Sequence, residues 1–212
     1  MIESTTTTPS DFYGGSRILL EGIIDEFLSC IGMIRRYQKS QTGWDPISSS
    51  TSRVKSPESM REKLIRDGLE PTLQNALAHE HDAAGVRLIC PMVDDVYRTA
   101  ELIRAIPDVT ILREKDFIAH PKPNGYRSYH LVLSVPVFLS DHKELVRVEV
   151  QLRTIAMDFW ASLEHQIHYK ASHEVPDCVV GELRECADII SQTDQRMQRL
   201  SKQIRCMEDK KD

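Results

Sequence analysis

The sequence has no apolar run near the roughly 20 residues that a membrane-spanning helix needs, and its Thr-rich start lacks the basic and apolar segments of a signal peptide. Aromatic residues are only 6% of the 212 residues, which leaves little material for an extended base-stacking surface. The five cysteines form no C-x-x-C pair, so a structural zinc site is not expected. We therefore expect a soluble, cytoplasmic protein without a membrane segment.

The charge balance excludes a further class of protein. The formal net charge is -5 and the isoelectric point about 5.9, which argues against a broad cationic surface for duplex nucleic acid. Local basic clusters remain compatible with small anionic ligands, and single-stranded RNA stays a possible partner. We expect a flexible lead over residues 1–15 and a single domain over residues 16–212.

Helical and strand periodicities alternate along the chain and predict an α/β (α+β) fold. The last two strands are separated by a short polar turn, so they should pair antiparallel in a mixed sheet of four or five strands. Residues 41–52 are predicted to form a loop, and long helices are predicted at both ends. The expected helices are 16–37, 57–68, 71–79, 93–107, 154–170 and 179–207, and the expected strands are 85–90, 109–118, 127–138 and 146–152.

A basic motif surrounds the second predicted helix. Ser56, followed by Pro57, gives a strong helix start. Spacings of three and four place three polar side chains on one helix face, and two more precede it, so we expect all five to converge on one anion. These residues are Arg53, Lys55, Ser59, Lys63 and Arg66. The alternative is an ordinary solvated helix face.

Two carboxylates occupy unusual places. Asp82 precedes the strand that carries Arg87, and it either binds Mg²⁺ or is an ordinary turn residue. Glu149 and Gln151 alternate with apolar residues, so a charge lies on a strand otherwise built for a core. Such a charge is costly unless it is paired or binds a metal. Asp82 and Glu149 are therefore our candidate Mg²⁺ ligands.

A third motif, residues 115–133, combines a Pro/Gly loop with a strand. In this predicted strand Tyr126, Ser128 and His130 should project to one face, with Lys122 in the loop before it. Tyrosine can stack on a base, and Lys122 and His130 can bind phosphate oxygens. A tyrosine packed over the sheet edge is the alternative.

The order of these segments resembles the synthetase domain of the RelA/SpoT family of GTP pyrophosphokinases, in the stand-alone form of the small alarmone synthetases. The segments are RVKSPES, DAAGVR, KDFI, HPKPNGYRSYH, VEVQLRT and MDFWASLEH. The resemblance implies a nucleotidyltransferase-like fold and a homotetramer held by terminal helices. It also implies Mg²⁺-dependent transfer of pyrophosphate from ATP to the 3′-hydroxyl of GDP or GTP, giving AMP and ppGpp or pppGpp in the stringent response.

The resemblance also implies roles for individual residues. Asp82 and Glu149 match the Mg²⁺ ligands, and Glu149 also matches the base that takes the 3′-hydroxyl proton. Arg53 and Arg87 match the guanidinium groups that flank adenine. The residues that match the ATP phosphate binders are Lys55, Ser59, Lys63 and Arg66. The residues that match the acceptor side are Tyr126, which stacks on guanine, and Lys115, Lys122, His130 and Gln151.

A non-catalytic tetramer that binds nucleotides or single-stranded RNA on the same fold is the alternative function. A degenerate member of that kind should have lost a metal ligand or the stacking tyrosine, whereas Asp82, Glu149 and Tyr126 are all present. Phe117 stands where many relatives have tyrosine, which removes a hydroxyl but none of the proposed functional groups.

Overall fold

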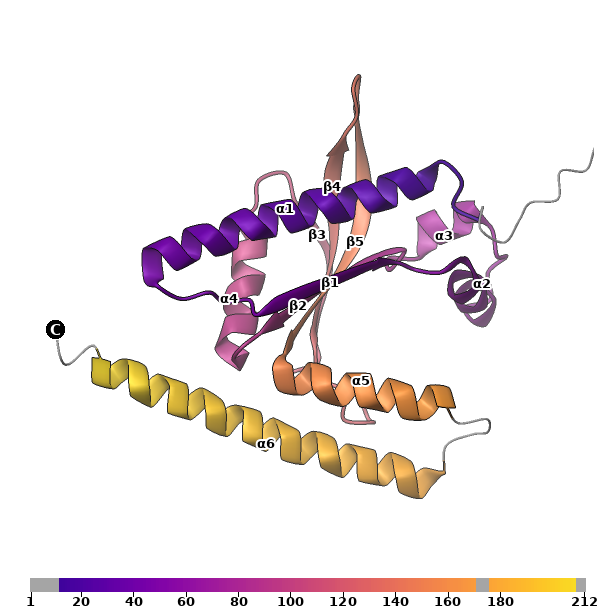
Figure 1. The fold of residues 1–212 in the computed structure, drawn as a ribbon. Coiled ribbons are helices and arrows are strands. Elements are labelled where there is room, and N and C mark those ends of the chain that lie inside the picture. The colour runs from indigo at the N-terminus through magenta and orange to yellow at the C-terminus, as the bar shows by residue number, and fades with distance from the viewer. Residues whose placement is uncertain (1–11, 171–175, 209–212) are drawn as a thin grey trace, which may run out of the picture.

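The computed structural model describes residues 12–170 and 176–208 (Figure 1). Most of the predicted flexible lead, residues 1–11, lies outside the described residues. The described end of that lead is packed, since Tyr13 is only 1% exposed. No helix among the described residues is long and apolar enough to cross a membrane.

The five strands form one mixed sheet in the order β1-β2-β5-β4-β3. Strands β2 and β5 are parallel and all other neighbours are antiparallel, so the prediction of a mixed sheet with an antiparallel last pair is confirmed. The strands are β1 (Ser49–Val54), β2 (Ala84–Cys90), β3 (Thr110–Asp116), β4 (Tyr129–Phe138) and β5 (Lys143–Thr154). The helices are α1 (Ser16–Thr42), α2 (Pro57–Arg66), α3 (Leu73–His79), α4 (Val93–Arg104), α5 (Ile155–Lys170) and α6 (Asp177–Glu208).

The structure corrects two sequence predictions. The segment predicted as a loop over residues 41–52 contains the end of α1 and most of the edge strand β1. The sequence of β1, SSTSRV, is almost wholly exposed, so it lacks the apolar alternation that reveals a half-buried strand. Strand β4 begins at Tyr129 and not at Arg127, because a turn is closed before it by Gly125 N donating to Lys122 O at 2.8 Å.

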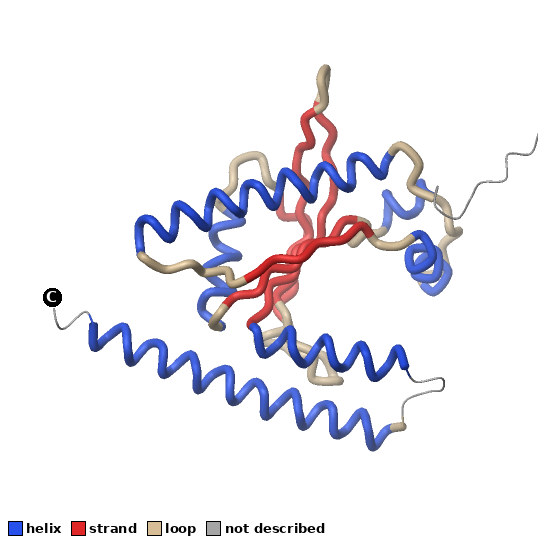
Figure 2. Tube along the Cα trace, in the orientation of Figure 1, coloured by secondary structure: helices blue, strands red, loops and turns tan. Residues whose placement is uncertain are grey.

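One face of the sheet carries the main core. In β5, Val148, Val150 and Leu152 are buried on this face, and they alternate with polar residues that point to the other face. Helices α1 and α4 contribute their apolar residues to the same cluster. Helix α1 crosses one side of the sheet, while α5 and α6 lie beyond the other side (Figures 1 and 2). The polar side chains of the central strands therefore lie on the less covered face.

Helix α6 lies against the loop that precedes β4. A Cβ atom added at Gly125 would lie 2.6 Å from the Ala187 Cβ, and the φ angle of Gly125 is 91°. We predict that Gly125→Ala destabilises the protein by about 1–3 kcal/mol, through overpacking and an unfavourable φ. Urea unfolding measures this loss.

The matched control is Gly181→Ala, because Gly181 lies within α6 and a Cβ there meets nothing within 4 Å. Alanine has the higher helix propensity, so this variant should gain up to about 1 kcal/mol. Equal stability changes in the two variants would show that α6 does not contact the Gly125 loop closely.

Candidate active site

Strand register places two adjacent rows of residues, most of them polar, across the less covered face. Residues directly opposite one another on neighbouring strands share a face, as do residues two apart in one strand. The first row is Arg53, Gly85, Glu149, Val132 and Arg113, and the second is Thr51, Arg87, Gln151, His130 and Lys115. Because Gly85 has no side chain, the space between Arg53 and Glu149 stays open.

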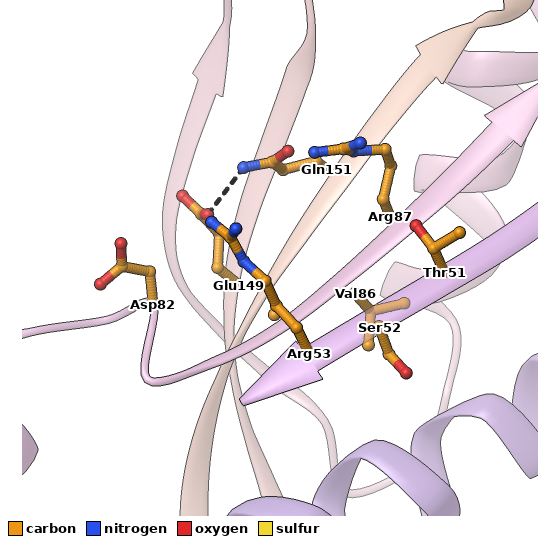
Figure 3. Close-up of a pocket in the computed structure, with 9 residues that line it drawn as sticks. Thr51, Ser52, Arg53, Asp82, Val86, Arg87, Glu149 and Gln151 are labelled. Carbon is orange, nitrogen blue, oxygen red and sulfur yellow. Dashed lines mark hydrogen bonds between the residues drawn. The ribbon is translucent and has the colours of Figure 1, made fainter. Parts of the chain in front are cut away.

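Two cavities lie over these rows, and both are lined by Asp82 and Glu149. The first cavity, of about 160 Å³, is also lined by Arg53, Arg87 and Gln151. Figure 3 shows these side chains projecting from β1, β2 and β5, with Asp82 in the segment before β2. The second cavity, of about 400 Å³, is also lined by Lys63, Lys115, Phe117, Lys122 and His130. The two carboxylates thus lie where the two cavities meet.

Asp82 is held between two lysines. Lys55 Nζ donates to Asp82 Oδ2 at 2.7 Å, and Lys63 Nζ donates to Asp82 Oδ1 at 2.8 Å. Lys63 also pairs with the buried Glu80. Burial by itself raises the pKa of Asp82, but the hydrogen bonds and charges of the two lysines outweigh it and hold the pKa below its usual value. Asp82 is therefore ionised at neutral pH.

Glu149 is held by two polar neighbours, Gln151 and His130. Gln151 Nε2 donates to Glu149 Oε2 at 2.9 Å, and His130 Nδ1 lies 3.3 Å from Glu149 Oε1. Burial raises the pKa of Glu149, but His130 and the hydrogen bond from Gln151 more than offset it, so the pKa lies below its usual value. The negative charge of Asp82 raises the pKa of Glu149, because the two carboxylates are neighbours.

The lowered pKa of Asp82 predicts a pH-dependent contribution to folding. A carboxyl group with a folded pKa below its unfolded value stabilises the fold above the unfolded pKa, near 3.9. That contribution disappears as the pH falls through the folded pKa. The loss of stability caused by Asp82→Asn should therefore be larger at pH 7 than at pH 3.

Urea unfolding at the two pH values measures this difference. The exposed Asp141 supplies the control for the substitution itself, and Asp141→Asn should cost little stability, because its ion pair with His142 lies at the surface. If Asp82→Asn lost the same stability at both pH values, the result would contradict the conclusion that Lys55 and Lys63 lower the pKa of Asp82.

The structure separates the five residues that were predicted to converge. Lys55 and Lys63 meet at Asp82, whereas Arg53 lines the first cavity from β1. The side chain of Arg66 is 72% exposed, and its nearest acidic partner is Asp67 at 3.7 Å. Ser59 lies in the exposed first turn of α2, where its Oγ accepts a hydrogen bond from Ser56 Oγ at 3.0 Å. Without a ligand, only Lys55 and Lys63 meet at one group, because Arg53 belongs to an edge strand and Arg66 faces solvent.

Tyr126 lies beside the second cavity but is not part of a strand, contrary to the prediction. Its hydroxyl is 2.8 Å from His130 Nε2, and its ring meets Phe117 edge-on with the centroids 6.0 Å apart. The Lys122 ammonium lies 4.8 Å from the centroid of the same ring. Ser128, predicted to share that face, is buried and donates to Leu152 O at 3.2 Å. Tyr126 is thus placed by its loop and its neighbours.

Sequence reasoning missed two residues of the site. Arg153 is 5% exposed and donates to Asp158 Oδ1 at 2.9 Å, while Arg87 Nη1 lies 3.3 Å from the same oxygen. The alternation that selected Glu149 and Gln151 also places Arg153 on their face, so the signal for Arg153 was present. The position of Asp158 in the first turn of α5 depends on how that helix leaves β5.

The donor set suits Mg²⁺. This ion prefers oxygen ligands and is usually held by one or two carboxylates together with substrate phosphates. Asp82 and Glu149 provide two carboxylates that line both cavities. Within residues 12–170 and 176–208, no group of three or more His, Cys, Asp or Glu residues could form a metal cage by itself. The residues present therefore fit a metal that substrate phosphates help to hold.

A five-stranded mixed sheet surrounded by helices, with two carboxylates and several cations over its open face, defines an α/β protein with a site suited to polyanionic ligands. Comparison with known proteins makes this more specific. Residues 52–174 match the family model described as "Region found in RelA / SpoT proteins", which spans more than half of the chain. The chain therefore belongs to the RelA/SpoT family, and the resemblance seen in the sequence is confirmed.

Relatives of the chain include proteins of similar length. It is 46% identical over 162 residues to the GTP pyrophosphokinase YwaC of Bacillus subtilis, and the match covers 76% of this chain and 77% of YwaC. Its structure resembles small alarmone synthetase 2 from B. subtilis with a TM-score of 0.80 and 41% identity, over 88% of this chain and 96% of that one. It also resembles B. subtilis small alarmone synthetase 1 bound to its product pppGpp, with a TM-score of 0.82 and 32% identity, over 91% and 98% of the two chains.

Proposed function

We propose that this chain is a GTP pyrophosphokinase that transfers pyrophosphate from ATP to the 3′-hydroxyl of GDP or GTP with Mg²⁺, producing AMP and ppGpp or pppGpp. One observation carries the proposal: Asp82 and Glu149 line both cavities, and separate sets of cations complete each cavity. Relatives that are named GTP pyrophosphokinases and a structural neighbour bound to pppGpp support the same reaction. We further propose that residues 16–212 act as one synthetase domain in the cytoplasm.

The first cavity is proposed to bind ATP. Arg53 and Arg87 lie on neighbouring strands at its edge, and planar guanidinium groups stack well on an adenine ring. Lys55 and Lys63 both pair with Asp82, which lines both cavities, and Lys63 also lines the second one, so they can bring positive charge to a triphosphate that reaches toward the acceptor. Ser59 and Arg66 are proposed as further phosphate contacts. Both are exposed here, so Arg66 must turn away from solvent to take that role.

The second cavity is proposed to bind the guanosine nucleotide. Tyr126 is the candidate for stacking on guanine, and Lys115 and Lys122 supply charge for its phosphates. His130 and Gln151 both contact Glu149, and they are proposed to hold the ribose beside that carboxylate. This placement brings the 3′-hydroxyl to the boundary between the two cavities.

The reaction forms one P–O bond and breaks another, and the 3′-hydroxyl loses its proton. The 3′-oxygen of the acceptor attacks the β-phosphorus of ATP, and the bond from the β-phosphorus to the oxygen bridging to the α-phosphorus breaks, so that AMP leaves. Glu149, ionised at neutral pH, takes the proton of the 3′-hydroxyl. Mg²⁺ held by Asp82 and Glu149 would neutralise part of the negative charge on the phosphate oxygens. Lys55 and Lys63 supply further positive charge and position the triphosphate.

Labelled ATP tests the proposed reaction. ATP carrying ³²P in the γ-phosphate is incubated with GDP, GTP or GMP, and the products are separated by thin-layer chromatography. The label is expected in a guanosine tetra- or pentaphosphate, with an equal amount of AMP formed. Formation of ADP would indicate transfer of a single phosphoryl group and would overturn the proposal. Single-stranded RNA binding without any nucleotide turnover would instead support the non-catalytic alternative.

The outer face of α5 supports the proposed homotetramer. Four large apolar side chains at four-residue spacing are all at least 41% exposed: Ile155, Phe159, Leu163 and Ile167. The first half of α6 packs against α5 of its own chain through Leu183 and Ile190, whereas Met197, Leu200 and Ile204 are exposed. Exposed apolar stripes of this length are typical of interfaces.

Light scattering measures the mass of this assembly. The chain of 24.3 kDa is expected to have four times that mass in solution, and Phe159→Glu should reduce it by placing a charge in the stripe. A monomeric mass for the unmodified chain would contradict the tetramer.

A further inference from the structure

Both oxygens of the Asp82 carboxylate are occupied by ammonium groups of the same chain. Lys55 Nζ donates to Oδ2 at 2.7 Å and Lys63 Nζ donates to Oδ1 at 2.8 Å. The three side chains are only 14–22% exposed, so solvent screens their charges weakly. Each Asp82 oxygen that could bind a metal ion therefore already has a cation as its partner.

A divalent ion at Asp82 would lie close to these lysines. Mg²⁺ binds oxygen ligands at about 2.0–2.1 Å, so an ion on either Asp82 oxygen would lie within about 5 Å of a lysine Nζ. Like charges repel strongly at this distance in a partly buried site. The other candidate ligand, Glu149, has the Gln151 amide and His130 as its neighbours. The two lysines thus close one of the two candidate metal ligands and not the other.

The side chains of the two lysines can leave Asp82 while their backbone stays in place. Lys55 N donates to Ala83 O at 2.9 Å, which fixes the backbone of Lys55 beside the segment that carries Asp82. Lys63 also pairs with the buried Glu80, so it keeps an acidic partner when it moves away from Asp82. A lysine ammonium lies at the end of a flexible four-carbon stem. Both ammonium groups can therefore turn from the carboxylate to a more highly charged anion.

On the basis of the proposed function, we propose that Lys55 and Lys63 close Asp82 to Mg²⁺ until a triphosphate is bound. The triphosphate carries more negative charge than one carboxylate, so it draws the two ammonium groups onto its own oxygens and opens Asp82 to the metal ion. The same two lysines therefore exclude the free ion from Asp82 before the nucleotide arrives and bind phosphate afterwards.

Mn²⁺ without any nucleotide tests the closed state, because electron paramagnetic resonance detects this ion directly. Mn²⁺ prefers the same oxygen ligands as Mg²⁺. In Lys55→Met, the affinity for Mn²⁺ should rise about tenfold, since a charge-assisted hydrogen bond no longer competes for Asp82 Oδ2. Adding Asp82→Asn to this variant should remove the gain. A gain that survives Asp82→Asn would place the ion elsewhere and would overturn the proposal.

The same variant should change the binding of the nucleotide in the opposite direction. The affinity for α,β-methylene ATP, a non-hydrolysable analogue, is measured by calorimetric titration in EDTA. It should fall about tenfold in Lys55→Met, because a contact to phosphate is lost. A general loss of structure would weaken both ligands, and Lys55→Gln is then the second variant, for which the same two opposite shifts are expected. An affinity for Mn²⁺ that fails to rise in Lys55→Gln as well would overturn the proposal.

Lys115→Met is the matched control. Lys115 lines the second cavity, and its ammonium lies 5.8 Å from the centroid of the Phe117 ring and not at Asp82. Its replacement removes one positive charge from the site, as Lys55→Met does, but it should leave the affinity for Mn²⁺ nearly unchanged. An equal gain in the two variants would show that net charge alone controls the metal ion and would contradict the closing of Asp82 by its own lysine partners.

The results separate this inference from the proposed function. The Mn²⁺ titrations use no nucleotide, so a selective gain in Lys55→Met supports the closing of Asp82 whatever the labelled-ATP assay yields. Absence of a guanosine polyphosphate in that assay would overturn the proposed function alone. Alarmone synthesis by a chain whose affinity for Mn²⁺ does not depend on Lys55 would overturn this inference and leave the synthetase proposal intact.

Discussion

Replacing Glu149 by glutamine is expected to lower the rate of alarmone synthesis by about 10²–10⁴-fold, the range of effects typical of general acid–base catalysis. Glutamine has nearly the same shape, but it has no negative charge with which to take a proton or hold a metal ion. The folded structure should persist, because Val148 and Val150 on the opposite face of β5 are unchanged. Initial rates with labelled ATP and GDP measure the effect, and circular dichroism checks the fold.

Glu144→Gln is the matched control for this variant. Glu144 lies at the other end of β5, where its half-exposed side chain is 3.4 Å from His142. Its replacement should leave the rate unchanged. Full activity in Glu149→Gln would refute the role proposed for that carboxylate.

Replacing Lys63 by methionine is expected to cost both stability and activity. Lys63 is the common partner of Glu80, which is 6% exposed, and of Asp82. Methionine keeps most of the apolar length but leaves the buried Glu80 charge without this partner. Breaking a buried ion pair from one side costs about 3–5 kcal/mol, so for this partly exposed pair we expect a loss of about 2–3 kcal/mol in urea unfolding.

The double variant Lys63→Met with Glu80→Gln separates the two effects. Removing the unpaired charge should restore most of the stability, since an uncharged pair avoids the cost of an isolated buried charge. Activity should not return, because the proposed phosphate contact of Lys63 is still missing. Recovery of activity in the double variant would show that Lys63 acts only as a structural partner of Glu80.

The sequence was most informative where local rules decide the structure. Ser56 and Pro57 correctly predicted the start of α2, where the Ser56 side chain accepts a hydrogen bond from Ser59 N at 3.2 Å. The alternation of Glu149 and Gln151 with valines correctly predicted a strand with one polar face, because period two follows directly from strand geometry. The antiparallel pairing of the last two strands was also confirmed, because only a short polar turn separates them.

The sequence was least informative where packing between distant segments decides. Strand β1 is a polar edge strand, and its pairing with β2 depends on backbone hydrogen bonds that have no side-chain pattern. Helical spacing placed Arg66 on the face of Lys63, but the long side chain turns to solvent. The shared contact of Arg87 and Arg153 with Asp158 joins β2, β5 and α5, so it requires the folded structure.

A crystal structure of the chain with Mg²⁺, α,β-methylene ATP and GDP tests the central claim most directly. We predict that the adenine lies in the cavity of Arg53 and Arg87 and the guanine in the cavity of Lys115 and Lys122. The 3′-hydroxyl of GDP should lie within about 2.6–3.2 Å of a Glu149 oxygen, which is the reach of a general base. Both nucleotides in a single cavity, or a 3′-hydroxyl remote from Glu149, would contradict the account.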